Sequence, residues 1–157
     1  MDSTVLANIV LALHLIPIAW IDFQRLIIPN ILNLSLAICG LAVSVAMLDK
    51  TLVNVLLAGG LTLAIFLLIS MIYGGLRNRR GIGAGDVKFL GAAATWIGLI
   101  GIPWIILIAS ISGLLFAVVA GICGRATRID SRLAFGPHLS LGLLVTWQLK
   151  DLIVVHG

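Results

Sequence analysis

Charged side chains are scarce in this sequence of 157 residues. They make up 10% of the chain, whereas 61% of the residues are hydrophobic and the mean hydropathy is +1.22. Soluble domains carry about 25% charged and about 45–50% apolar residues. The composition therefore excludes an ordinary soluble domain and predicts an integral membrane protein.

Glutamate is absent, and cysteine is nearly so. All six side-chain carboxyls belong to aspartates. Cys39 and Cys123 stand alone, within or at the edge of apolar runs, in a spacing that fits neither a disulfide framework nor a zinc site. We expect both cysteines to be core residues, and we expect no metal or other cofactor.

Long apolar runs are abundant. They cover residues 4–21, 30–48, 51–73, 87–123 and 137–155. Four of them have about the length that a helix needs to cross a hydrocarbon core of roughly 30 Å. The run 87–123 is too long for one span, and "GLIGIPW" interrupts it, so we expect two helices that turn near Gly101 and Pro103. The prediction is an all-α membrane protein of six helices in a single domain, 1–157.

A secretory signal peptide is the alternative for residues 1–21. Such a peptide has a basic segment before its apolar run and small residues before its cleavage site. The sequence has neither feature before Asp22. We therefore expect the first run to be a membrane helix.

Most basic residues fall in loops on one side of this arrangement. These are Arg25, Arg77, Arg79, Arg80, Lys88, Arg125, Arg128 and Arg132. Lys50 and Lys150 fall on the other side. The positive-inside rule places the basic loops in the cytoplasm and both termini outside. We interpret these residues as topology anchors and lipid headgroup contacts, and not as a surface for nucleic acid.

Two aspartates are not explained by exposure to water. Asp2, Asp49 and Asp151 lie near the termini or in a turn, and Asp130 lies among loop arginines. Asp22 ends the first predicted helix and Asp86 begins the fourth, so both should reach the same cytoplasmic boundary. Carboxylates at membrane depth are costly, and they indicate a functional site.

Two carboxyls in one site share a proton, because both cannot ionise easily. The ionised member can take a proton from water while the protonated member polarises a peptide carbonyl, as in aspartic proteases. The helix ends predict that Asp86, at an N-terminus, carries the charge and that Asp22, at a C-terminus, carries the proton.

Glycines surround Asp86 in "GIGAGD". Gly83 and Gly85 could adopt unusual backbone dihedrals and let a substrate strand or the first helix approach Asp86. The alternative is a flexible loop at a helix start. The helix that follows, from Asp86 to about Ile100, would be only about 22 Å long, so Asp86 could lie below the membrane surface.

Three segments together resemble one family. "GAGDVKFL" at 83–90 is similar to the GxGDxKL pattern of the prepilin peptidases, a group of GxGD membrane aspartic proteases. "DFQRLIIPN" at 22–30 resembles their first aspartate segment, and "FGPHLSLG" at 135–142 resembles the start of their last helix.

The resemblance implies that Asp22 and Asp86 are catalytic and that the substrates are type IV pilin-like precursors. Their basic leaders would be cut at the cytoplasmic face of a prokaryotic inner membrane. The resemblance also assigns motif or substrate-positioning roles to Gly83, Gly85, Lys88, Pro29, Asn30, Gly136 and Pro137.

Larger family members carry a methyltransferase region with paired CxxC motifs, which this sequence lacks. The resemblance therefore implies a peptidase without N-methylation activity. Its compact size is most similar to peptidases of tight-adherence (Flp-type) pilus systems. Type II secretion pseudopilins and archaeal flagellin-like precursors are the alternative substrates.

Some residues near these motifs have two interpretations. His138 and Ser140 depart from the family pattern; His138 could tune the aspartates or could be a loop histidine without a catalytic part. Lys88 should face away from Asp86 and anchor the helix at the headgroups or bind substrate backbone. We expect His14 to be packed or hydrogen-bonded, and Pro137 to occupy the first turn of the last helix.

Small residues recur every four positions in the predicted fifth helix. These are Ala109, Gly113, Ala117 and Gly121. The ridge predicts close helix packing, either within the chain or in a homo-oligomer.

Two other function classes remain open at this stage. A small proton-coupled carrier could load protons on the same aspartates, although a carrier site is expected near the bilayer midplane. A non-catalytic subunit of a pilus or secretion apparatus is the second alternative.

Overall fold

A computed structural model describes residues 3–77, 83–123 and 134–155. Seven helices lie in these ranges: α1 (Ser3–Arg25), α2 (Asn30–Met47), α3 (Leu52–Arg77), α4 (Ala84–Ile97), α5 (Ile102–Ile122), α6 (Gly136–Gln148) and α7 (Lys150–Val155). The predicted all-α membrane fold is confirmed. Several residues discussed above lie outside the described ranges, namely Asp2, Arg79, Arg80, Arg125, Arg128, Asp130 and Arg132.

The chain crosses a membrane several times. Four helices are long and apolar enough to span one: Thr4–Arg25, Asn30–Met47, Leu52–Gly75 and Ile102–Ile122. The spans of α3 and α5 have the highest mean hydropathies, 2.6 and 2.7, yet only 17% of each is buried inside the chain. Their exposed apolar side chains therefore suit contact with lipid.

The run 87–123 forms two helices, as predicted, with a turn at residues 98–101 and Pro103 in the first turn of α5. Gly98, which begins this turn, has a φ of 79°. The predicted helix 137–155 is wrong as a single helix, because α6 ends at Gln148 and α7 begins at Lys150. Polar side chains interrupt the apolar run there: Gln148 donates to Asn8, and Lys150 lies over the Trp147 ring.

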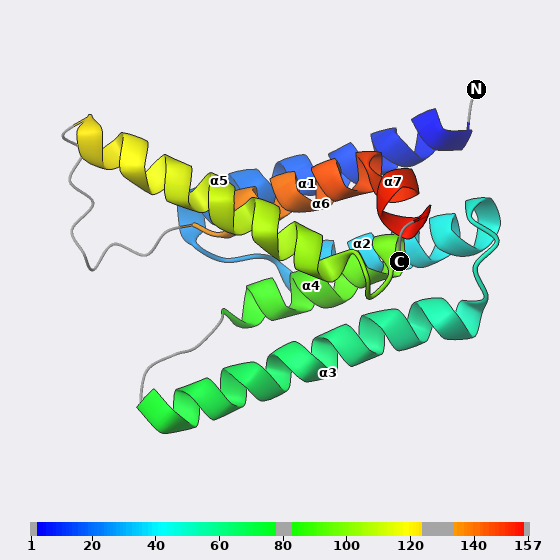
Figure 1. Cartoon of the computed structure of the whole chain (residues 1–157), viewed down its shortest axis with the longest axis horizontal. Helices are drawn as coiled ribbons and strands as arrows, with labels where there is room; N and C mark the ends of the chain where they lie inside the picture. Colours follow the sequence, from blue (N-terminus) through cyan, green and yellow to red (C-terminus); the bar gives the residue numbers. More distant parts are fainter. Residues whose placement is uncertain (1–2, 78–82, 124–133, 156–157) are drawn as a thin grey trace.

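The short helix α4, of 14 residues, forms the centre of the bundle. Its residues from Phe89 to Ile97 are all buried, and it packs against α2 and α3 (Figure 1). Gly40 of α2 lies directly against the side chains of Thr95 and Trp96, so a larger residue there would displace them. Trp96 Nε1 also donates to the carbonyl of Leu36 at 2.9 Å. Small residues and buried hydrogen bonds thus hold α4 in place.

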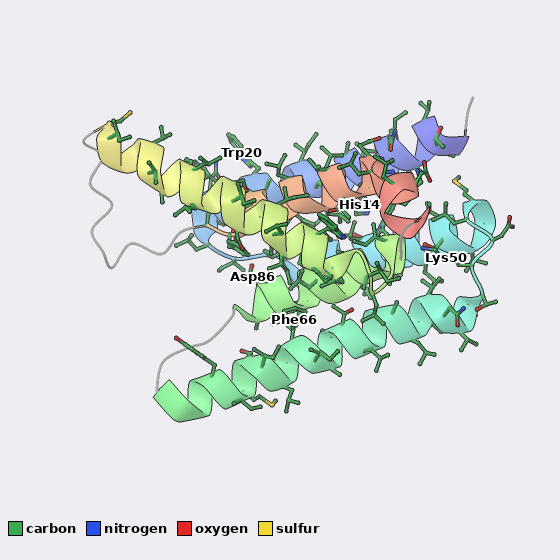
Figure 2. All side chains as sticks on the ribbon, viewed as in Figure 1. His14, Trp20, Lys50, Phe66 and Asp86 are labelled. Atoms are coloured by element: carbon green, nitrogen blue, oxygen red, sulfur yellow. The ribbon has the colours of Figure 1, made fainter. Side chains whose placement is uncertain are left out.

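One end of the bundle gathers six helix termini. The ends of α1, α3 and α5 and the beginnings of α2, α4 and α6 all lie there, opposite the beginning of α1 and opposite α7 (Figure 1). We call this the site end. Asp86 lies toward it, whereas Lys50 lies at the opposite end (Figure 2). The site end is where the two sequence-selected aspartates belong.

Candidate active site

Asp22 lies in the last turn of α1 and is only 5% exposed. Its Oδ2 accepts the backbone N–H of Gly136, the first residue of α6, at 2.7 Å. A Cβ on Gly136 would lie 2.7 Å from both Cβ and Oδ2 of Asp22. The absence of a side chain at Gly136 therefore permits the contact that holds Asp22.

Asp86 lies in the first turn of α4, outside the four candidate spans, and is partly buried. Burial, and to a smaller extent the negative charge of Asp22, raise the pKa of the Asp86 carboxyl to about 6. The two aspartates thus interact electrostatically although they are 64 positions apart in the sequence.

The predicted division of charge between them is wrong for Asp86. The N-terminus of α4 should favour an ionised Asp86, but burial and the neighbouring carboxyl outweigh it and raise its pKa. Asp22 instead receives an N–H from the start of α6, which stabilises negative charge on its Oδ2. The raised pKa of Asp86 thus runs against the predicted charge on that carboxyl.

Gly83 and Gly85 provide space. Gly83 has an ordinary extended conformation, with φ −56° and ψ 134°, so the expectation of unusual dihedrals is wrong at this position. A Cβ on Gly83 would lie 2.8 Å from Oδ2 of Asp86. A Cβ on Gly85 would lie 3.2 Å from Cβ of Ile28. The first glycine makes room for the Asp86 side chain and the second lets the start of α4 approach the segment before α2.

The Pro29–Asn30 turn joins this segment to α4. Pro29 caps α2, and its carbonyl accepts the N–H groups of Leu32 and Asn33. Asn30 Oδ1 accepts a hydrogen bond from Lys88 Nζ at 2.9 Å. Lys88 is exposed, and its contact with Asn30 connects two of the three motif segments.

One buried polar residue beside the site was not selected from the sequence. Asn33, in α2, donates from Nδ2 to the carbonyl of Gly85 at 3.3 Å. An amide within the apolar run 30–48 was the available signal, since buried polar groups are costly unless they have partners.

The other residues with two interpretations have structural contacts. Pro137 lies in the first turn of α6, as predicted. His138 Nδ1 lies 3.0 Å from Ser112 Oγ of α5, and its ring contacts Phe116 and Phe135. His14 is hydrogen-bonded, as predicted, through Nδ1 to the carbonyl of Val10. These contacts attach α6 to α5 and satisfy His14.

The small-residue ridge of α5 is divided. Ala109 and Gly113 are buried within the chain, whereas Ala117 and Gly121 are exposed. A Cβ added to Gly142 of α6 would lie 2.6 Å from the carbonyl oxygen of Ile105 in α5. The helices α5 and α6 thus approach closely at Ile105 and Gly142, and the buried half of the ridge lies within the chain.

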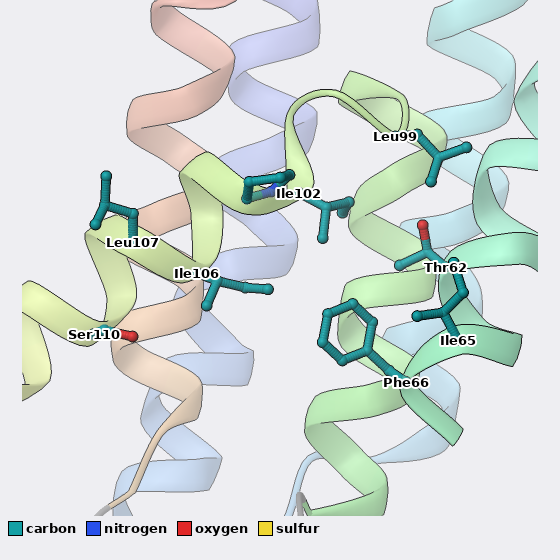
Figure 3. Close-up of a pocket in the computed structure, with 9 residues that line it drawn as sticks. Thr62, Ile65, Phe66, Leu99, Ile102, Ile106, Leu107 and Ser110 are labelled. Atoms are coloured by element: carbon teal, nitrogen blue, oxygen red, sulfur yellow. The ribbon is translucent and has the colours of Figure 1, made fainter. Parts of the chain in front are cut away.

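A cavity of about 550 Å³ lies between α3 and the start of α5 (Figure 3). Its lining consists of Thr62, Ile65, Phe66, Leu99, Ile102, Pro103, Ile106, Leu107 and Ser110. Neither Asp22 nor Asp86 lines it. The cavity is largely apolar and separate from the carboxyl pair, so the candidate active site is placed by the aspartates and not by this cavity.

Residues 9–118 match the model of the type IV leader peptidase family, and both aspartates lie within the match. The chain belongs to this family. It is 34% identical over 145 residues to the prepilin leader peptidase/N-methyltransferase of Burkholderia pseudomallei, which covers 90% of this chain and 45% of that protein. The enzyme of the same name from Legionella pneumophila is 30% identical over 141 residues, or 89% of this chain and 48% of that protein.

A shorter stretch is more similar to a third relative. The prepilin leader peptidase/N-methyltransferase of Escherichia coli K12 is 41% identical over 68 residues, which are 43% of this chain and 29% of that protein. The Burkholderia and Legionella relatives match most of this chain, but the match spans only about half of their own length. No solved structure matches this chain.

Proposed function

We propose that this chain is a membrane aspartic endopeptidase that removes the leader from type IV prepilin-like precursors, with Asp22 and Asp86 as the catalytic pair. The observation that carries the proposal is that buried Asp22, in the last turn of α1, and Asp86, in the first turn of α4, lie at the same end of the bundle, where the charge of Asp22 contributes to the raised pKa of Asp86. Membership of the type IV leader peptidase family and the names of the relatives support the reaction and the substrate class.

The chemistry needs one proton on the pair. Ionised Asp22 takes a proton from a water molecule as the water oxygen attacks the scissile carbonyl carbon, and Asp86 gives its proton to the carbonyl oxygen. When the tetrahedral intermediate collapses, Asp22 returns its proton to the leaving amine and Asp86 recovers a proton from the diol. The raised pKa of Asp86 suits a group that donates a proton near neutral pH.

The cytoplasmic membrane face is the proposed place of cleavage. Arg25 ends α1 and Lys88 bonds to Asn30 at the start of α2, so both lie at the site end, whereas Lys50 lies at the opposite end (Figure 2). This distribution agrees with the positive-inside rule. We propose that both termini are outside and that a Flp-type prepilin is the substrate. We further propose cleavage without N-methylation, and lipid headgroups and a second copy of the chain as other partners, the second copy at Ala117 and Gly121.

Co-expression with a panel of type IV prepilin precursors tests the proposal. Wild type should shorten at least one precursor, whereas Asp22→Asn and Asp86→Asn should leave it full-length. Asp49→Asn is the matched control, because Asp49 is exposed in the turn between α2 and α3. A chelator should leave cleavage unchanged. Processing by either site variant would exclude the pair as the catalytic centre.

A further inference from the structure

Asn33 is buried in the first turns of α2, where it is 4% exposed. Its side-chain amide reaches across to α4 and donates from Nδ2 to the backbone carbonyl of Gly85 at 3.3 Å. The two residues are 52 positions apart in the sequence. The bond therefore fixes the distance between two helix beginnings at the site end.

The chemistry of the partner fixes the orientation of the amide. A backbone carbonyl only accepts hydrogen bonds, so the nitrogen of Asn33 must face Gly85 and the oxygen must face away. That oxygen, Oδ1, is buried and has no hydrogen-bond partner in the described part of the chain. An unpartnered buried acceptor lowers stability, and a leucine of similar size would not carry that penalty. Stability alone does not account for an amide at this position.

The accepting carbonyl belongs to the peptide unit that carries Asp86. Gly85 C=O, Asp86 N–H and the Cα of Asp86 belong to one planar peptide group. A hydrogen bond to the carbonyl therefore restrains the position of the Asp86 Cα. Ile28 restrains Gly85 from the side, and Asn30 holds Lys88 two residues beyond Asp86. The segment from Ile28 to Asn33 thus contacts α4 before and after the aspartate.

We propose that Asn33 is a positioning residue that orients Asp86 for catalysis by holding the Gly85–Asp86 peptide. The proposal rests on the proposed function of Asp86. Asn33 acts through a backbone group and touches no reacting atom. The buried, unpartnered Oδ1 of Asn33 lowers the stability of the fold, while its Nδ2 helps to fix the position of the Asp86 carboxyl. Functional residues commonly lower stability in this way.

The test compares Asn33→Leu and Asn33→Asp with the exposed control Asn54→Leu. Asn33→Leu should insert normally and melt at the same or a higher temperature than wild type. Its kcat for a cleaved prepilin should nevertheless fall by about tenfold or more, because a small displacement of a catalytic group lowers the rate steeply. Asn54→Leu should match wild type in both measurements.

Asn33→Asp separates a hydrogen bond from shape. A protonated carboxyl can donate to Gly85 and an ionised one cannot, so this variant should retain activity at acidic pH and lose more of it than wild type as pH rises. A purely steric role would give no greater loss of activity than in wild type as pH rises.

Infrared titration of the Asp86 carboxyl gives a readout that does not depend on cleavage. In Asn33→Leu its midpoint should move to lower pH, because a less restrained carboxyl is better hydrated. Unchanged kcat with an unchanged midpoint would overturn the positioning role, and so would a loss of activity matched by a loss of thermal stability. Absence of cleavage by wild type would instead overturn the proposed function, while the infrared midpoint would still decide whether Asn33 restrains Asp86.

Discussion

The backbone N–H of Gly136 binds Oδ2 of Asp22 at 2.7 Å across 114 positions of sequence. Gly136 begins α6, so the position of that helix and the position of Asp22 depend on one another. The family match ends at residue 118, before Gly136. A residue beyond the matched range therefore holds one of the two candidate catalytic carboxyls.

Replacement of Gly136 should impair catalysis more than folding. In Gly136→Ala the new Cβ would lie 2.7 Å from the Cβ of Asp22, and that atom cannot move away without shifting α1. We expect the rate of prepilin cleavage to fall by about tenfold or more while the protein still reaches the membrane. Gly60→Ala is the control, because no atom lies within 4 Å of a Cβ there. Wild-type cleavage by Gly136→Ala would show that this contact is not needed.

Gly85→Val should separate α4 from the segment before α2. The Cβ alone would lie 3.2 Å from Cβ of Ile28, and the two valine methyl groups need further space. We expect clearly reduced cleavage in membranes that contain normal amounts of the protein. Gly75→Val, in the open part of α3, should retain activity. Equal activity of the two variants would remove the close-approach role of Gly85.

Asp86 should titrate near pH 6, and Asp22 should contribute to that value. Burial is the larger cause of the raised pKa and the charge of Asp22 is the second, so Asp22→Asn should lower the midpoint but leave it above the ordinary value of 3.8. Infrared difference spectra against Asp86→Asn would isolate the carboxyl. In wild type, kcat/KM should decline as pH rises through the midpoint, because Asp86 then loses the proton that it donates. An unchanged midpoint in Asp22→Asn would contradict interaction between the two carboxyls.

Lys88 and Asn30 should behave as a coupled pair. Lys88→Met and Asn30→Leu each remove the 2.9 Å hydrogen bond, and the double variant should lose little more thermal stability than either single variant. The loss should be small, on the order of 1 kcal/mol or less, because the bond is exposed. Asn30→Asp keeps an acceptor for the ammonium group and should be as stable as wild type. Additive losses in the double variant would show that the two side chains act independently.

Sequence patterns predicted the helices well and selected two aspartates that lie at the same end of the bundle. Apolar runs near the length of a bilayer core are a strong signal, and Asp22 and Asp86 stand out because the other aspartates lie beside termini, turns or arginines. Pro137 was placed correctly because proline suits the first turn of a helix. The catalytic role of the aspartates stays a prediction that the variants above test.

Contacts between distant segments could not be predicted in the same way. The bond from Gly136 to Asp22 and the bond from Asn33 to Gly85 depend on how helices sit against one another, and no local periodicity encodes that arrangement. The charge assignment failed for Asp86 because the helix dipole is a local effect, whereas burial and the nearby Asp22 are tertiary effects. The break at Leu149 was missed because apolar residues precede Gln148 and follow Asp151, so that the run 137–155 has the length of one span.

The short helix α4 affects on which side of the membrane each end of α5 lies. Its 14 residues give a length of about 21 Å, so α4 is shorter than the four helices that are long enough to span a membrane. Yet α3 and α5 both end at the site end, so α4 must return the chain across the bundle between them (Figure 1). A count of four crossings, which leaves out both α4 and α6, would invert α5 but keep the residues after α6 on the same side. These fourteen residues therefore decide the orientation of α5, and a reporter fused between Gly98 and Gly101 would read it directly.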